Sequence, residues 1–337
     1  MSQRRSAASR HVKTCIRFAA QIAWIAACSA SLAFGQSYPA KPVRIIVPIA
    51  AGGATDIMAR AIAQKLTESF GQQVLVENRP GANAIIGAEA VAKSAPDGYT
   101  LLFTPAGTFV NNPFLYNRLP YDAAKDFVPV AMCCIMAQAI VVHPSLNVST
   151  LRELIALAKA EPGKLSYAST GSGSIVHINM EAFRHLAGID IVHVPYKGSA
   201  PAITDLVAGR VSMTVVIFGV VQEYLRSGRL KALAVGAATR SSMFPDVPTA
   251  AEAGLPGFDA SGWIGLFAPA GTPRENVARL NAEVRNAIGN QQFIDRWLKG
   301  AGLESPNVGS PEQFDEFIRA DMQRWGRLIK ESGAKRE

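Results

Sequence analysis

The sequence predicts an α/β protein of doubly wound character, in which mostly parallel sheets are flanked by helices. Apolar runs alternate with amphipathic helical patterns, and glycine- or serine-rich loops lead from several runs straight into helices. Continuous apolar runs are typical of parallel strands that are covered on both faces. The expected strands are Val43–Ala50, Val74–Glu77, Thr100–Pro105, Ala139–His143, Leu165–Ala168, Ile191–Pro195, Val211–Phe218, Leu230–Gly236 and Gly262–Ala268.

Helix starts are marked by Ser or Thr followed three residues later by Glu or Gln, which is the capping-box pattern. Pro273 and Pro311 stand at expected first helical positions, where a missing N–H costs nothing. The aromatic residues that follow Pro311 recur on one helical face, so we interpret them as core. The expected capping boxes are Thr150–Glu153, Thr249–Glu252, Thr272–Glu275 and Ser310–Gln313.

Residues 1–35 have the pattern of a secretory signal peptide: five basic residues and no acid, with an apolar run over Phe18–Ala33. A small-x-small pattern at 33–35 would start the mature chain at Gln36 and send it to the periplasm. A transmembrane anchor is an alternative, although the run is short for a span. Lipoprotein processing at Cys28 is a second alternative.

Without residues 1–35 the chain carries 29 basic and 26 acidic residues, so its net charge is +3 rather than +8. No basic stripe with interleaved aromatics remains, and we expect no nucleic-acid partner. Cys133 and Cys134 are adjacent in an apolar segment, and adjacent cysteines bond to each other only with strain. We interpret them as buried thiols, with a vicinal disulfide or a redox role as the alternatives.

About 300 mature residues are enough for two domains. Two segments are candidates for crossings between them, 128–139 and 257–262. If both cross, the first lobe is discontinuous, with residues 36–138 and 258–337, and the second lobe holds residues 139–257. Two crossings make a hinge, and ligands are favoured between lobes.

The loop after the first strand is a candidate anion site, because a helix N-terminus offers unpaired N–H groups and a favourable dipole. Asp56 caps the helix or accepts a hydrogen bond from a ligand. An ordinary strand-to-helix turn is the alternative, and neither a dinucleotide fingerprint nor a Walker A pattern is present. The candidate residues are Ala51, Gly52, Gly53, Thr55 and Asp56.

A second loop follows Thr100–Pro105 and is expected at the same sheet edge, where ligands of open α/β sheets bind. An ordinary turn is again the alternative. The candidate residues are Thr104, Ala106, Gly107 and Thr108.

A serine-rich loop after Leu165–Ala168 offers many neutral donors, which suits a carboxylate; a flexible loop without a ligand is the alternative. His177 follows as a candidate contact. Its spacing with Glu181 and His185 is four residues, but such positions diverge around a helix, so we expect no metal site. The candidate residues of the loop are Ser169, Thr170, Gly171, Ser172, Gly173 and Ser174.

The loop after Ile191–Pro195 offers the backbone of Gly198, Ser199 and Ala200, and Ser199 could cap the next helix. The Lys197 ammonium is a weaker candidate, since such a lysine usually points to water. The chain contains no G-x-S-x-G, H-E-x-x-H or C-x-x-C motif, so we expect neither an enzyme nor a cofactor.

Taken together, these segments resemble the receptor component of tripartite tricarboxylate transporters, the Bug family of solute-binding proteins. Each motif is weak by itself, and their order over residues 38–333 is specific. The motifs read YPAKPVRIIVP, AAGGATDIMAR, VENRPGANAIIGAEAVAKSAPDGYTLL, VNNPFLY, LSYAST, HVPYKGSAPAITDLVAGRV, GRLKALAV, PDVPTAAEAGLPGF and FAPAGTP.

The resemblance implies a two-lobed periplasmic binding protein fold of the type II-like, Venus-flytrap kind. It implies a monomeric receptor that captures a small carboxylate mainly with main-chain amides and delivers it to a membrane permease. A sensory protein that signals to a membrane partner is the alternative function. The segments that the resemblance favours are Ala51–Thr55, Thr104–Thr108, Ser169–Ser174 and Gly198–Ala200.

The chain departs from the family pattern in the strand after Gly209, where an acid is common in the family and Val216 and Phe218 stand here. The resemblance therefore implies a less polar distal pocket, with Phe109 and Trp263 as further candidates. Such a pocket would suit an aromatic or aliphatic carboxylate better than citrate or an amino acid.

Overall fold

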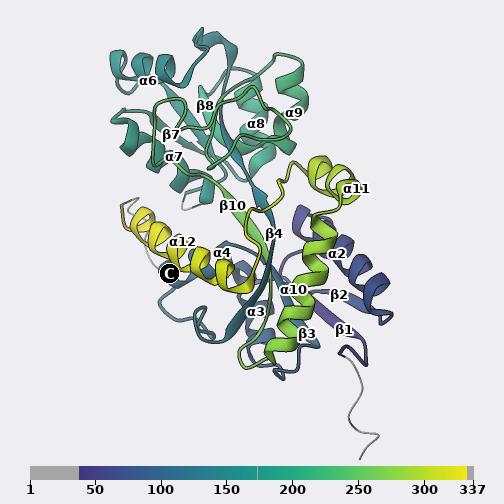
Figure 1. Cartoon of the computed structure of the whole chain (residues 1–337). Coiled ribbons are helices and arrows are strands. Elements are labelled where there is room, and N and C mark those ends of the chain that lie inside the picture. The colour runs from purple at the N-terminus through teal and green to yellow at the C-terminus, as the bar shows by residue number, and fades with distance from the viewer. Residues whose placement is uncertain (1–37, 173, 332–337) are drawn as a thin grey trace, which may run out of the picture. The chain divides into compact units, whose positions relative to one another are not determined.

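The computed structural model describes residues 38–172 and 174–331. The expected signal peptide, its cleavage site and Cys28 lie outside these residues. Residues 42–337 form one compact unit, and all the helices and strands described here lie in it (Figure 1). No helix in this part of the chain is long and apolar enough to cross a membrane.

The first sheet has five strands in the order β2-β1-β3-β10-β4. β1 is parallel to β2 and β3, whereas β10 is antiparallel to β3 and β4. The strands are β1 (Val43–Val47), β2 (Val74–Asn78), β3 (Thr100–Pro105), β4 (Phe127–Met136) and β10 (Gly262–Pro269).

The second sheet has five strands in the order β7-β6-β8-β5-β9. β6 is parallel to β7 and β8, whereas β5 is antiparallel to β8 and β9. The strands are β5 (Gln138–Val142), β6 (Ser166–Ser169), β7 (Val192–Pro195), β8 (Met213–Ile217) and β9 (Lys231–Val235).

Both sheets are thus mixed, and the expectation of mostly parallel sheets holds only for the strands joined by helices. Chain continuity explains the difference. β4 leads into β5 through Ala137 alone, and β10 enters the first sheet after β9 of the second. Strands that arrive in this way have no helical crossover to turn them parallel to their neighbours.

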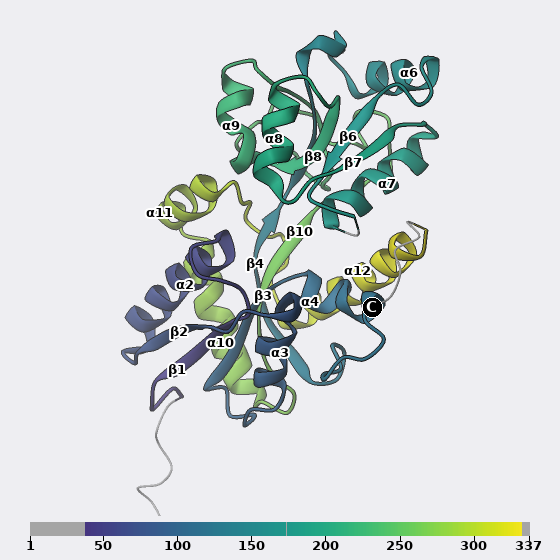
Figure 2. The ribbon, with the colours of Figure 1, turned by 180° about the vertical axis from the view of Figure 1, so that it is seen from behind.

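Helices cover both faces of each sheet (Figures 1 and 2). The longer ones are α2 (Ala54–Phe70), α3 (Ile85–Ala92), α6 (Leu151–Ala160), α7 (Ile175–Ala187), α8 (Ser199–Val207), α9 (Phe218–Arg226), α10 (Arg274–Ile288) and α12 (Pro311–Glu331). The short ones are α4 (Gly107–Val110), α5 (Asn112–Leu115), α11 (Gln291–Phe293), the 3-10 turns η1 (Ala82–Ala84) and η2 (Pro144–Leu146), and the π-helical turn η3 (Ile294–Lys299).

The capping boxes form in part as expected. Thr150 accepts from the Glu153 N–H, and the Ser310 and Gln313 pair bonds reciprocally. The Thr272 prediction was wrong: its hydroxyl donates to the Pro269 carbonyl, and Pro273 itself takes the N-cap position of α10.

Buried aromatic residues form the core on one side of the first sheet. Phe109 stacks on Phe267 with ring centroids 4.1 Å apart, and Trp263 meets Phe314 edge to face. Cys133 and Cys134 lie fully buried in β4 as free thiols, and burial raises the pKa of both. The β4 strand itself was missed, because the sequence around the cysteines was interpreted only as a crossing.

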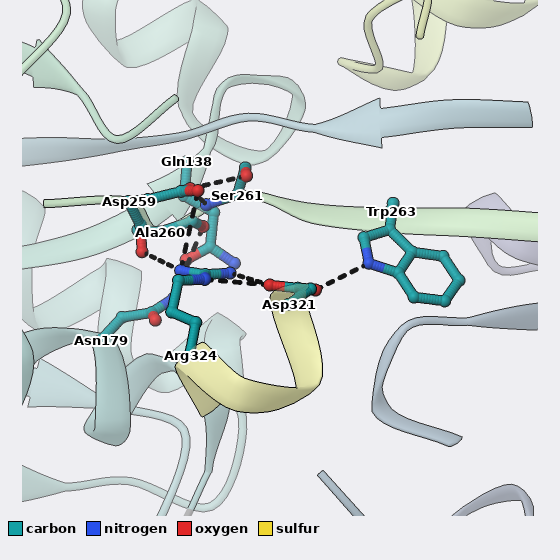
Figure 3. Close-up of polar contacts among 8 residues, drawn as sticks. All are labelled: Gln138, Asn179, Asp259, Ala260, Ser261, Trp263, Asp321 and Arg324. Atoms are coloured by element: carbon teal, nitrogen blue, oxygen red, sulfur yellow. Dashed lines mark hydrogen bonds and ion pairs between the residues drawn. The ribbon is translucent and has the colours of Figure 1, made fainter. Parts of the chain in front are cut away.

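The segment that leads into β10 is tied to α12 and α7 by a polar cluster (Figure 3). Arg324 donates to the Asp259 carbonyl at 2.6 Å and pairs with the buried Asp321 at 2.7 Å. Asp321 also accepts from the Trp263 indole N–H at 2.8 Å, and Asn179 of α7 donates to the Ala260 carbonyl at 3.5 Å. The cluster fixes the start of β10 against two helices.

Candidate functional site

The predicted site residues lie where parallel strands end. In the first sheet, residues 51–56 follow β1 and residues 106–108 follow β3. In the second sheet, Ser169 ends β6 and residues 170–172 follow it, while residues 198–200 and 218 follow β7 and β8. Because parallel strands end at the same edge, the loops of each sheet gather at one edge.

The loop after β1 turns through Gly52, which has a φ of +90°. Gly53 occupies the N-cap position of α2, so no side chain caps the helix there. Ala51, Gly52 and Gly53 are exposed, whereas Thr55 is buried. The first-turn N–H groups of a helix have no intrahelical partner, so α2 presents donors beside an exposed loop. This geometry suits an anion.

Asp56 holds this loop in place. Its carboxylate accepts from the Gly52 N–H at 3.0 Å, from Arg60 at 3.0 Å and from Asn78 of β2 at 2.9 Å. Asn78 also donates to the Ile49 carbonyl at 3.1 Å. Burial opposes ionisation, but the three hydrogen bonds outweigh it and hold the pKa of Asp56 below its ordinary value. The carboxylate is thus committed to the protein itself.

The loop after β3 is shaped by two buried hydroxyls. Thr104 and Thr108 share a hydrogen bond of 2.5 Å and are almost inaccessible to solvent. The Ala106 N–H donates to the Trp263 carbonyl at 2.8 Å, and Gly107 begins the short helix α4. The side chains predicted here therefore contact one another, and Gly107 is the more accessible position.

The serine-rich loop begins at Ser169, whose side chain is fully buried. Ser169 Oγ contacts His193 Nε2 at 2.6 Å, the Gly171 carbonyl at 3.1 Å and the Gly171 N–H at 3.2 Å. Ser174 ends the loop as the N-cap of α7 and accepts from the His177 N–H at 3.2 Å. Gly173 lies outside the described residues.

Three rings stack beneath this loop. His193 stacks on Tyr167 and on His177, with centroid distances of 4.9 and 4.1 Å, and the centroids of Tyr167 and His177 lie 6.5 Å apart. Tyr167 donates to Glu181 at 2.6 Å, and Glu181 pairs with Arg184 at 2.8 Å. Burial lowers the pKa of both histidines from 6.5, and His177 adds to the shift of His193.

Sequence reasoning selected His177 but missed His193 and Tyr167. A usable signal was present, since each missed residue stands two positions before the end of a strand that leads into a candidate loop. The sheet register then places Tyr167 directly beside His193.

The loop after β7 places Gly198 at the N-cap of α8, with a φ of +116° and no side-chain cap. Ser199 is therefore the first helical residue, and the expectation that it caps the helix was wrong. Ser199 and Ala200 are exposed. The φ of Gly198 lies in the left-handed region, which glycine adopts without steric cost.

Val216 and Phe218 lie in a hydrophobic cluster of the second sheet, and Phe218 stacks on Phe244 at 4.8 Å. Phe109 and Trp263 belong to the aromatic core of the first sheet. The four candidates for an apolar pocket thus divide between two separate cores. Among the described residues, no group of three or more His, Cys, Asp or Glu could hold a metal ion.

Comparison with known proteins identifies the class of molecule to which this geometry belongs. A family model described as "Tripartite tricarboxylate transporter family receptor" matches residues 58–334. Protein BugT of Bordetella pertussis is 40% identical over 301 residues, which cover 89% of this chain and 91% of BugT.

Solved structures give the same result. Rpa4515 of R. palustris with adipate is 36% identical with a TM-score of 0.72, over 88% of this chain and 99% of that one. MatC from Rhodopseudomonas palustris with bound malate is 34% identical with a TM-score of 0.67, over 87% and 100%. The fold is the two-lobed α/β fold of periplasmic binding proteins. The matching family and the similar solved structures are solute-binding receptors, not enzymes.

Proposed function

Because the chain belongs to the tripartite tricarboxylate transporter receptor family, we propose that it captures a small carboxylate and delivers it to a membrane permease of the same transporter type. The observation that carries the proposal is the set of helix N-termini and small-residue loops at the strand ends of both sheets. Such loops bind an anion through neutral N–H and hydroxyl donors, without a fixed positive charge.

The proposed ligand contacts divide between two lobes. The first lobe, residues 36–138 and 258–337, contributes Ala51–Thr55 and the Thr104–Thr108 loop. The second lobe, residues 139–257, contributes Ser169–Ser174, His177 and Gly198–Ala200. Asp56 supports the first loop by accepting a hydrogen bond from the Gly52 N–H. The chain passes between the two sheets after β4 and before β10, which is the arrangement of a hinge.

The ligand class is a small organic acid. Two related structures carry adipate and malate, which are both dicarboxylates. In this chain β8 ends in apolar residues instead of an acid, which favours a ligand with an uncharged body. We place the mature protein in the periplasm as a monomer, starting at Gln36.

The test is thermal unfolding of the protein from Gln36 to Glu337 against mono-, di- and tricarboxylates, aromatic acids and amino acids. Bound solute is first removed by unfolding and refolding. A ligand at 100 times its Kd stabilises the folded state by about 2.7 kcal/mol, which raises Tm by several degrees. We expect a saturable rise for aliphatic or aromatic carboxylates. A flat response from the refolded protein to every acid would contradict the proposal.

A further inference from the structure

We propose that His193 is a positioning residue that sets the shape of the turn at residues 169–171, the first part of the serine-rich loop, through the Ser169 hydroxyl. The inference rests on the proposed function, since this loop is one of the four proposed carboxylate contacts. His193 lies one residue inside β7 and belongs to none of the loops. Among the described residues of the loop, its hydrogen-bond partner is Ser169, at 2.6 Å.

The hydrogen bonds of Ser169 favour one of the two neutral forms of His193. A hydroxyl donates one hydrogen bond and accepts two. Ser169 Oγ has three partners: the Gly171 N–H, which can only donate, the Gly171 carbonyl, which can only accept, and His193 Nε2. All three bonds form together when the hydroxyl donates to the Gly171 carbonyl and His193 donates from Nε2–H. The network therefore favours the Nε2–H form of His193.

The ring of His193 is held so that this N–H stays on its target. Tyr167 and His177 both stack on it, at interplanar angles of 16° and 20°, and the centroids of these two rings lie 6.5 Å from each other. Tyr167 is itself anchored by its hydroxyl on Glu181, and Glu181 is paired with Arg184. Contacts with two neighbouring rings restrict the rotation of His193 and so keep the direction of its N–H, which is what a positioning residue must do.

The loop depends on this support because Ser169 binds both the N–H and the carbonyl of Gly171. Gly171 has a φ of +128°, a conformation that other residues rarely adopt. The Ser169 carbonyl also accepts from the Tyr196 N–H at 3.0 Å, which ties the loop to the end of β7. Loss of the His193 donor would leave a buried hydroxyl oxygen with an empty acceptor position and loosen the turn at Gly171.

Two substitutions of His193 distinguish the effect of its N–H donor from the effect of its stacked ring. His193→Phe keeps a ring in the stack and removes the N–H, whereas His193→Gln removes the ring and keeps a terminal N–H donor. Adipate is the probe, measured by titration calorimetry at pH 8. We expect His193→Phe to weaken adipate binding about tenfold, and His193→Gln to weaken it less.

A double-mutant cycle tests whether His193 acts through Ser169. Ser169→Ala should weaken binding as much as His193→Phe, and the double variant should bind no more weakly than either single one. Additive losses would overturn the proposal, as would wild-type affinity in His193→Phe. Tm of each ligand-free variant checks that the loss of affinity is not a loss of folded protein.

Hydrogen exchange of the Gly171 amide tests the same proposal without any ligand. The Gly171 N–H is bonded to Ser169, so its exchange should be faster in His193→Phe than in wild type, and less so in His193→Gln. Equal exchange in all three proteins would overturn the positioning role even if no carboxylate bound. Failure of wild type to bind any acid, with the exchange pattern as expected, would contradict the proposed function alone.

Discussion

At the scale of single residues, His177 and His193 stack at 4.1 Å, half-buried between α7 and the sheet. Protonation of either ring would place a charge in a partly buried site, so the pKa of each is lowered from 6.5. Unfolding returns both to water. Between the folded pKa and 6.5 the unfolded chain therefore binds more protons than the native one, and stability falls as pH falls through this window.

Substituting both histidines should flatten the pH dependence of stability. We expect wild type to lose unfolding free energy between pH 7 and pH 5, and the His177→Gln/His193→Gln variant to lose less. Urea unfolding at several pH values gives the measurement. His185→Gln is the control, because His185 is an exposed histidine on the same helix, α7. If the double variant loses as much unfolding free energy as wild type, the two stacked histidines are not the source of the pH dependence.

The same residues show what the sequence could predict about the site. The loops were predicted because Gly and Ser after an apolar strand are a local pattern. His193 could not be selected by that pattern, because its role depends on the register of β6 and β7, which pairs residues 26 positions apart. Asp56 was predicted to be important, but its partner Asn78 lies on another strand, so only the structure shows that its acceptor oxygens are already used.

At the scale of elements, the start of α2 is built from three pieces of chain. Asp56 of the helix binds the N–H of Gly52 in the preceding loop and the amide of Asn78 on β2. A carboxylate in the first turn of a helix also interacts favourably with the helix dipole. The position of the proposed anion loop is thus determined by one buried side chain.

Removing this carboxylate should destabilise the fold and disturb the loop. We expect Asp56→Ala to cost about 1–3 kcal/mol of unfolding free energy at pH 7, the usual cost of leaving buried partners unsatisfied. Because the pKa of Asp56 is lowered, this contribution is present at neutral pH and is lost as pH falls below about 3.8. Arg60→Gln is the control; its side chain is 52% exposed, and we expect a loss below about 1 kcal/mol. Equal losses of unfolding free energy in the two variants at pH 7 would contradict the conclusion that the Asp56 carboxylate holds this loop in place.

The elements themselves were largely predictable, and the errors have physical causes. Strands with continuous apolar sequence were found within a few residues of their ends, because burial on both faces leaves a clear pattern. β4 was missed because it runs into β5 with one residue between them, so no turn signal separates the two. The Thr249–Glu252 capping box forms both of its bonds, yet only a turn follows it, since Gly254 adopts a φ of +95°.

At the scale of the whole molecule, residues 300–304 contact elements of both sheets: β4 of the first sheet, and α9 and the loop after β9 of the second. Glu304 pairs with Ile135 of the first sheet through backbone bonds of 2.9 Å. Its carboxylate accepts from the hydroxyl of Ser241 at 2.5 Å and that of Ser242 at 2.7 Å, in the loop that follows β9. No local sequence signal predicts this connection, because its partners lie more than 60 residues away.

Two glycines approach each other here, Gly219 of α9 and Gly302, and a Cβ on Gly302 would meet the backbone of Gly219. A Cβ on Gly219 would lie 2.7 Å from the Ala301 carbonyl oxygen, which is backbone and cannot rotate away. Helix propensity and packing therefore predict opposite signs for Gly219→Ala: alanine favours a helix by about 1 kcal/mol over glycine, whereas overpacking costs about 1–3 kcal/mol.

We expect packing to prevail, so that Gly219→Ala lowers Tm. Gly300→Ala is the matched control, because Gly300 has a helical φ of −60° and no atom within 4 Å of an added Cβ. That variant should unfold at the wild-type temperature or slightly above it. Thermal unfolding of the three proteins is the measurement. A rise in Tm for Gly219→Ala would mean that residues 300–304 move to accommodate the added methyl group. The contact between residues 300–304 and α9 would then not be a fixed part of the fold.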